Sequence, residues 1–236
     1  MYRERRDRPT PPANAVVREP KRTLKRRRPL SRSMRENDLA ARIVDHYEAA
    51  HDDPEIRLEE PYDAEGRRGV VDVHVRLRTP EPVDHAIELK SDAAVRRATG
   101  ANEVLRQYRR MERYFHADEA HRLRPKLGRS GPGACYLLFF APTPTCVHHV
   151  ATHRTLYASV EPTGSVGDVP TARTVGFLTG LDGDPADLGY LSVNGEASFG
   201  SPAFLASVPE GSRLAESLRA VDDDVVAFGD GSDTDD

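Results

Sequence analysis

The stretch that decides the fold is GVVDVHVRLRTPEPVDHAIELK, residues 69–90. Its first half alternates valine or leucine with polar residues, which is the period-two pattern of a strand with one buried face. Pro80 and Pro82 mark a turn, and residues 85–90 then alternate in the same way. The stretch therefore predicts two neighbouring strands, over 69–77 and 85–90, that can pair as a hairpin.

Three charged side chains of this hairpin form a candidate active site. Asp72 lies on the polar face of the first strand, and Glu88 and Lys90 share one face of the second because they are two residues apart. If the strands pair, Asp72 can lie beside Glu88. Like charges opposed across a sheet repel, so such a pair is best tolerated with a hard divalent cation between the carboxylates, and Mg²⁺ suits this donor set.

The neighbouring groups extend the predicted metal site. The backbone carbonyl of Leu89 could supply a further ligand, and Lys90 places a positive point charge beside the metal. Lys90 could orient an attacking water or stabilise the charge that develops on a phosphate. The metal would polarise the phosphoryl oxygen and help generate hydroxide. The hairpin therefore favours metal-assisted chemistry on a phosphate group.

The segments around the hairpin predict an α/β order. Ser31 and Ser33 offer N-caps for a helix over 34–50, whose apolar positions fall on one face. A short strand is expected over 56–59. The elements predicted after the hairpin are a helix over 93–115 with a weak point at Gly100, a fully buried strand over 134–141 and a helix over 146–159.

Composition divides the chain into four regions. Residues 1–32 hold 12 Arg or Lys against 3 Asp or Glu, although the whole chain has a net charge of -4. Their Pro- and Arg-rich composition predicts a disordered basic arm, which serves either nucleic-acid contact or solubility. The core is expected over 33–160, a β-rich extension or added strands over 161–221, and a disordered acidic tail over 222–236.

The composition is that of a water-soluble chain. Of 236 residues, 31% are charged, and no apolar run reaches the roughly 20 residues that cross a bilayer. The opening MYRERRDRPTPP lacks the apolar part of a signal peptide, and two cysteines do not make a disulfide framework. We therefore expect a cytoplasmic protein without a membrane partner.

The hairpin resembles the D…ExK signature of the PD-(D/E)XK nucleases. In GVVDV, Asp72 is separated by fifteen residues from Glu88-Leu89-Lys90, and the order of helix, hairpin, helix and strand is similar to the core of that family. The resemblance covers residues 34–160. It implies a restriction-endonuclease-like α/β fold, with a mixed central sheet flanked by helices, and hydrolysis of DNA with Mg²⁺ or Mn²⁺.

The resemblance also implies roles for single residues. It assigns the family's Asp, Glu and Lys to Asp72, Glu88 and Lys90. Many members carry a further Glu on the first helix, and Glu36 matches that place. RecB-like members and some archaeal junction resolvases carry a polar residue on the helix after the ExK strand, which Gln107 resembles. Two departures are that no Pro precedes Asp72 and that the helix does not reproduce the RecB-like spacing.

The use of lysine adds to the resemblance. Lysine occurs at only four positions, and Lys90 is one of two after residue 32. The chain therefore keeps lysine where the family's chemistry needs it and uses arginine almost everywhere else. Together with the acidic tail, this usage resembles proteins of salt-loving archaea or their viruses, whose acidic surfaces stay hydrated.

Three alternatives stay open. A basic stretch on the predicted helix 93–115 indicates either DNA-phosphate contacts or a solvated helix face; its members are Arg106, Arg109, Arg110 and Arg113. A soft-ligand cluster indicates either a structural Zn²⁺ site or ordinary histidines; its members are Cys146, His148, His149 and His153, with Cys135 nearby. The alternative to a nuclease is a non-catalytic nucleic-acid-binding protein that retains the fold; a homodimer is compatible with either.

Overall fold

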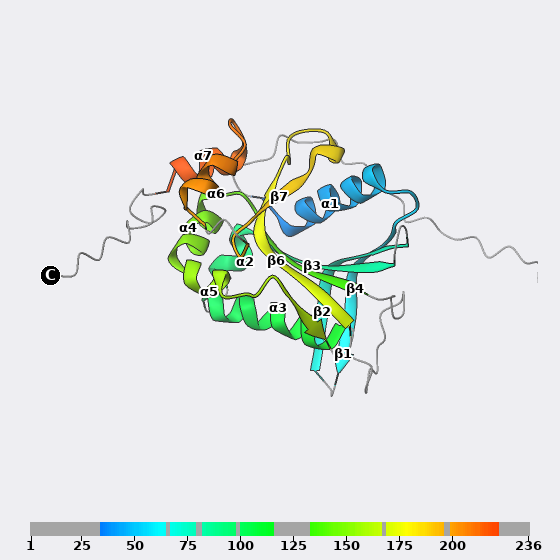
Figure 1. Ribbon diagram of the computed structural model, residues 1–236. Helices are drawn as coiled ribbons and strands as arrows, with labels where there is room; N and C mark the ends of the chain where they lie inside the picture. Colours follow the sequence, from blue (N-terminus) through cyan, green and yellow to red (C-terminus); the bar gives the residue numbers. More distant parts are fainter. Residues whose placement is uncertain are drawn as a thin grey trace, which may run out of the picture.

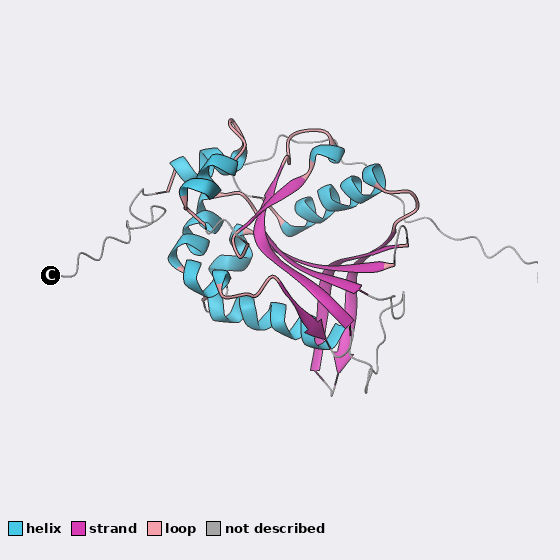
Figure 2. Cartoon of the chain, viewed as in Figure 1, coloured by secondary structure: helices cyan, strands magenta, loops and turns pink. Residues whose placement is uncertain are grey.

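The computed structural model describes residues 34–64, 67–78, 82–97, 100–115, 133–166, 169–195 and 199–221. Within them a curved sheet runs through the molecule, with helices on both of its faces (Figures 1 and 2). The basic arm predicted over 1–32 and the acidic tail predicted over 222–236 lie outside the described residues, as does the basic loop near residue 125.

The described strands form one mixed sheet in the order β1-β2-β3-β4-β6-β5, with β7 pairing β6 beside β5. Strands β1 to β3 pair in antiparallel fashion, β3, β4 and β6 run parallel, and β5 and β7 are antiparallel to β6. The strands are β1 (Glu55–Ala64), β2 (Arg67–Leu77), β3 (Val83–Lys90), β4 (Gly133–Phe140), β5 (Thr163–Val166), β6 (Val169–Thr179) and β7 (Gly189–Ser192).

Two long helices cover opposite faces of the sheet (Figure 1). On one face α1 (Glu36–Ala50) contacts β3, where the Tyr47 hydroxyl lies 2.5 Å from His85 Nδ1. On the other face α3 (Ala101–Phe115) packs through Tyr108, whose hydroxyl donates to the Tyr136 carbonyl at 3.1 Å. The remaining helices are α2 (Asp92–Arg97), α4 (Pro144–Thr152), α5 (Arg154–Ala158), η1 (Pro185–Asp187), α6 (Pro202–Ser207) and α7 (Arg213–Arg219).

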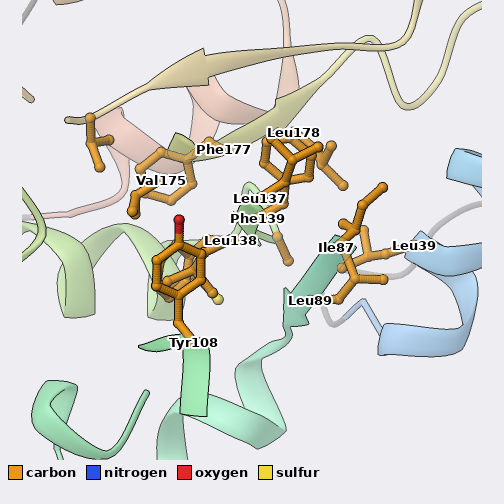
Figure 3. Packing of buried hydrophobic residues seen from close by; sticks show 14 of the residues in the cluster. Leu39, Ile87, Leu89, Tyr108, Leu137, Leu138, Phe139, Val175, Phe177 and Leu178 are labelled. Atoms are coloured by element: carbon orange, nitrogen blue, oxygen red, sulfur yellow. The ribbon is translucent and has the colours of Figure 1, made fainter. Parts of the chain in front are cut away.

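The core explains the continuous apolar run of β4. This strand lies between β3 and β6 and is covered on both faces: Tyr136, Leu138 and Phe140 are buried on one face, and Leu137 and Phe139 on the other. Figure 3 shows the cluster, with Leu39 of α1 beside the end of β3. Each such side chain contributes roughly 1.5–3 kcal/mol by leaving water. The predicted α/β fold with a mixed sheet flanked by helices is confirmed.

The structure corrects several predicted boundaries. Helix α1 begins after Arg35, which makes no side-chain cap, so neither Ser31 nor Ser33 is the N-cap. Strand β1 runs from Glu55 to Ala64, well past the predicted 56–59. It passes through Pro61, which an edge strand tolerates because one side of it needs no ladder donor.

Both long predicted helices are interrupted. The helix predicted over 93–115 is divided into α2 and α3 around Gly100, whose φ of 103° is a conformation that favours glycine. The helix predicted over 146–159 is divided at His153, which ends α4 and caps α5. Strand β5 and helix α6 were not predicted at all.

Residues beyond 160 contribute to the same sheet. Strand β6 pairs with β4 along seven residues, and β5 and β7 pair with β6. Buried Asn194 ties this part together, because its side chain accepts from Val175 N and donates to the Val160 carbonyl. Residues 161–221 were expected to form either a β-rich extension or added strands, and the structure shows strands added to the sheet. In the part of the chain that is described, no helix has the length and apolarity to cross a bilayer.

Candidate active site

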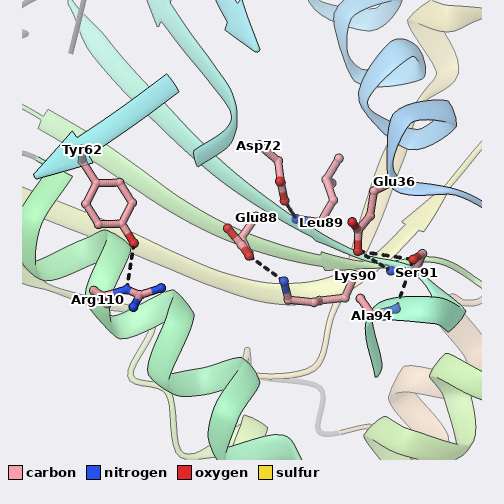
Figure 4. A network of polar contacts seen from close by, with 9 residues as sticks. All are labelled: Glu36, Tyr62, Asp72, Glu88, Leu89, Lys90, Ser91, Ala94 and Arg110. Atoms are coloured by element: carbon pink, nitrogen blue, oxygen red, sulfur yellow. Dashed lines mark hydrogen bonds and ion pairs between the residues drawn. The ribbon is translucent and has the colours of Figure 1, made fainter. Parts of the chain in front are cut away.

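The hairpin of β2 and β3 brings Asp72 and Glu88 together. Val73 pairs with Ile87, and continuing this antiparallel register by one residue sets Asp72 opposite Glu88. Directly opposed residues of neighbouring strands share a face. Lys90 lies two residues further along β3, and its Nζ donates to Glu88 Oε1 at 2.5 Å. Figure 4 shows the three side chains converging at the end of the hairpin.

Asp72 is partly buried and held by the backbone of β3. Its Oδ2 accepts a hydrogen bond from Leu89 N at 2.7 Å. Burial, followed by repulsion from Glu88, raises the pKa of Asp72 from 3.8 to about 7, while the Leu89 N–H and Lys90 oppose the rise. Near neutral pH this carboxyl group can therefore take up or release a proton, and a nearby cation would favour the charged form.

Glu88 and Lys90 form a buried ion pair. Their exposed fractions are 8% and 6%, and the salt bridge offsets part of the cost of removing both charges from water. The backbone at this point is also fixed, since the Lys90 carbonyl accepts from Ala141 N at 2.9 Å. Cys146 Sγ lies 3.7 Å from the same carbonyl. These contacts hold the end of β3, and with it the position from which Lys90 extends.

Glu36 of α1 reaches the same end of β3. Its Oε1 accepts from both the backbone N and the hydroxyl of Ser91, each at 3.3 Å. Its charge contributes to the raised pKa of Asp72, so Glu36 is electrically part of the site although it is hydrogen-bonded to Ser91. The structure thus brings Glu36 to the predicted cluster.

Gln107 forms no hydrogen bond with the cluster in the part of the chain that is described. It is partly buried on α3, one turn before Arg110. Its position therefore gives no support to a RecB-like arrangement.

Arg110, one of the candidate phosphate contacts, is paired near the site with Tyr62, which the sequence did not reveal. Arg110 Nε donates to the Tyr62 hydroxyl at 3.3 Å, and Figure 4 shows this pair facing Glu88. Burial raises the pKa of Tyr62, and the charge of Glu88 adds to the rise. The strand predicted over 56–59 ended before Tyr62, so the sequence analysis did not place this residue beside the site. The available signal was an aromatic residue directly after Pro61.

The donor set fits a hard divalent cation. Asp72 and Glu88 offer carboxylate oxygens from neighbouring strands, and burial together with repulsion from Glu88 raises the pKa of Asp72; a bound cation would relieve both effects. Within the described ranges, no three His, Cys, Asp or Glu side chains gather around one point. The cation would thus be held by two carboxylates, the Leu89 carbonyl and waters, a set typical of Mg²⁺.

The soft-ligand residues contact other parts of the fold. Cys146 is buried and lies 3.7 Å from Asp92 Oδ1, while His149 Nε2 lies 2.7 Å from the Tyr157 hydroxyl. His149 and His153 contact each other only as rings, 5.1 Å apart. No metal-binding group of three or more forms in the part that is described. The structure therefore gives no support to a structural Zn²⁺ site at these residues, which make packing and hydrogen-bonding contacts.

The arginines of α3 differ in their surroundings. Arg106, Arg109 and Arg113 are exposed, whereas Arg110 is partly buried. Arg106 lies 3.6 Å from Glu103, an exposed pair that contributes little to stability. The helix therefore presents a charged outer surface and a single arginine directed toward the site.

Comparison with known proteins adds one finding. The family model described as a PD-(D/E)XK nuclease superfamily domain matches residues 34–222. The match includes the hairpin, both covering helices and the strands beyond residue 160. No curated protein and no solved structure matches the chain.

Proposed function

The chain belongs to the PD-(D/E)XK nuclease superfamily, and from this premise we propose that it hydrolyses phosphodiester bonds in DNA with Mg²⁺ or Mn²⁺ as cofactor. The observation that carries the proposal is the convergence of Asp72, Glu88 and Lys90 at one end of the hairpin. A nuclease of this kind needs carboxylates for a cation and a positive group for the phosphate, and both are present.

Each residue has a distinct role in the proposed reaction. Asp72 and Glu88 would hold the cation, which would supply Lewis-acid activation of the phosphate and of the attacking water. Lys90, close to Glu88, orients the attacking water or stabilises negative charge on the phosphate. Glu36 fixes Ser91 and adds negative potential. The buried surroundings favour this chemistry because charges interact more strongly away from bulk water.

DNA is the proposed partner. The exposed arginines of α3 would contact backbone phosphates near the site, and the basic arm 1–32 would add sequence-independent affinity. Phosphate contacts of this kind position a duplex without reading its sequence. The acidic remainder of the chain and the preference for arginine favour an enzyme that works at high salt, where the contribution of the arm is small.

The test is a cleavage assay with purified protein. Linear, branched and single-stranded DNA are incubated with Mg²⁺, Mn²⁺ or EDTA, at moderate and high salt. We expect metal-dependent cleavage that is lost in Asp72→Ala, Glu88→Ala and Lys90→Ala. The carboxylate variants should also lose metal affinity, whereas Lys90→Ala should retain part of it. If the wild type binds DNA but cuts none of these substrates with either metal, a non-catalytic DNA-binding role replaces the nuclease.

A further inference from the structure

Arg110 differs from the arginines of the fold that are paired with a carboxylate. Buried Arg76 lies 2.8 Å from Asp84, and Arg213 lies 2.6 Å from Asp182. Arg110 is partly buried, and within the described residues its contact is with the Tyr62 hydroxyl alone. A guanidinium withdrawn from water without an opposite charge is costly, so its placement calls for an anion that binds there.

The location of Arg110 identifies the anion. Figure 4 places its guanidinium and the Tyr62 hydroxyl opposite the Glu88–Lys90 pair. The charges of Glu88 and Lys90 both act on Tyr62, which puts this hydroxyl within electrostatic reach of the candidate catalytic groups. The Asp72 and Glu88 carboxylates, which suit a cation, therefore have Lys90 bonded to Glu88 and the Arg110 guanidinium facing them, and these positive groups suit a phosphate.

The position of Tyr62 is strongly constrained. Its ring is 2% exposed and meets Phe115 edge-on, with centroids 6.5 Å apart. Tyr62 pairs with Gly69 across β1 and β2, and a Cβ on Gly69 would approach the Tyr62 ring to 2.1 Å. Gly69, the first residue of the quoted motif, therefore makes room for the ring that supports Arg110.

We propose that Arg110 is a further catalytic residue, which binds a non-bridging oxygen of the scissile phosphate, and that Tyr62 is the positioning residue for its guanidinium. The proposal rests on the proposed nuclease function and deepens it, because it distinguishes Arg110 from the exposed arginines of α3. A planar guanidinium donates to two phosphate oxygens at once. Held in place before the reaction, it stabilises charge that grows in the transition state.

The experiment compares single-turnover cleavage by wild type, Arg110→Ala and the control Arg219→Ala, which removes an exposed arginine at the end of α7. We expect Arg110→Ala to lower the rate at saturating protein by about 10²–10³-fold and Arg219→Ala to leave it unchanged. Added guanidinium ion at low millimolar concentration should restore part of the activity of Arg110→Ala alone. Equal rates for the two variants, or no rescue, would overturn the catalytic role.

Tyr62→Phe tests the positioning role separately. It removes one hydroxyl and keeps the buried ring, so thermal stability should change little. We expect the single-turnover rate to fall about tenfold with unchanged DNA affinity, because only the orientation of the guanidinium is lost. A normal rate in Tyr62→Phe excludes the positioning role.

Failure of the wider function has a different signature. If the wild type cuts no DNA, the nuclease proposal fails, and affinity for a fluorescent DNA duplex becomes the readout for the anion site. A greater loss of affinity in Arg110→Ala than in Arg219→Ala then supports phosphate binding by Arg110. Equal losses overturn it.

Discussion

Replacing Asp72 with asparagine should stabilise the metal-free protein at mildly alkaline pH. The change removes one of two opposed carboxylates but keeps a side-chain oxygen. This oxygen can accept the hydrogen bond that Leu89 N donates to Asp72 Oδ2 at 2.7 Å in the wild type. Burial and Glu88 raise the pKa of Asp72 from 3.8 to about 7, a difference equivalent to roughly 4 kcal/mol at about 1.4 kcal/mol per pH unit. Asp72 is partly exposed, so solvent screening reduces the expected gain to about 2 kcal/mol.

The dependence on pH follows from the direction of this change. Because the pKa of Asp72 is higher in the folded state, the folded protein binds the proton more tightly than the unfolded chain does. Its stabilising contribution is complete below pH 3.8 and is lost as the pH rises through about 7. The unfolding free energies of wild type and Asp72→Asn should therefore be closest in acid and differ most at about pH 8.

Urea unfolding in EDTA between pH 5 and pH 8 measures this difference, with Asp52→Asn, an exposed carboxylate after α1, as the matched control. We expect a gain that grows with pH in Asp72→Asn and no such trend in Asp52→Asn. Added Mg²⁺ should stabilise the wild type by mass action and so reduce the difference in unfolding free energy between wild type and Asp72→Asn. A loss of stability in Asp72→Asn at pH 8, or a difference that does not vary with pH, would refute the account of the paired carboxylates.

Three further predictions test neighbouring parts of the account. Gly100→Ala should lower the free energy of unfolding, measured by calorimetry, by roughly 1–2 kcal/mol. The reason is that a φ of 103° is strained for alanine, although a Cβ at this position would meet open space. Glu36→Gln keeps the acceptor for Ser91 but removes a charge near Asp72, so the Mg²⁺ concentration for half-maximal cleavage should rise roughly tenfold. Deleting residues 1–32 should reduce the slope of DNA affinity against salt concentration, and an unchanged slope in binding titrations would exclude a role for the arm.

The hairpin was predictable because its information is local. Alternation at residues 71–77 and 85–90 fixes which side chains share a face, and one register then sets Asp72 opposite Glu88. The apolar run of β4 likewise predicts a strand covered on both sides. These features depend on period and short spacing, which a single sequence contains.

The remaining parts depend on contacts between distant segments. Tyr62 and Arg110 are 48 residues apart and meet only because β1 continues past Pro61 and α3 crosses the sheet. The helix predicted over 93–115 is interrupted at Gly100 because this residue has a positive φ, which the apolar spacing of the sequence does not indicate. The histidines near 150 had suitable spacing for Zn²⁺, but packing directs His149 to Tyr157. Spacing along a helix shows which groups can meet and not which partner each one takes.

The central claim is that Asp72 and Glu88 hold one divalent cation for hydrolysis. The most direct test is an anomalous difference map from crystals grown with Mn²⁺. The account predicts a peak between the two side chains, with carboxylate oxygens at roughly 2–2.5 Å, and its disappearance in Asp72→Asn. A peak at His149 and His153, or no peak at the end of the hairpin at saturating Mn²⁺, would contradict the claim.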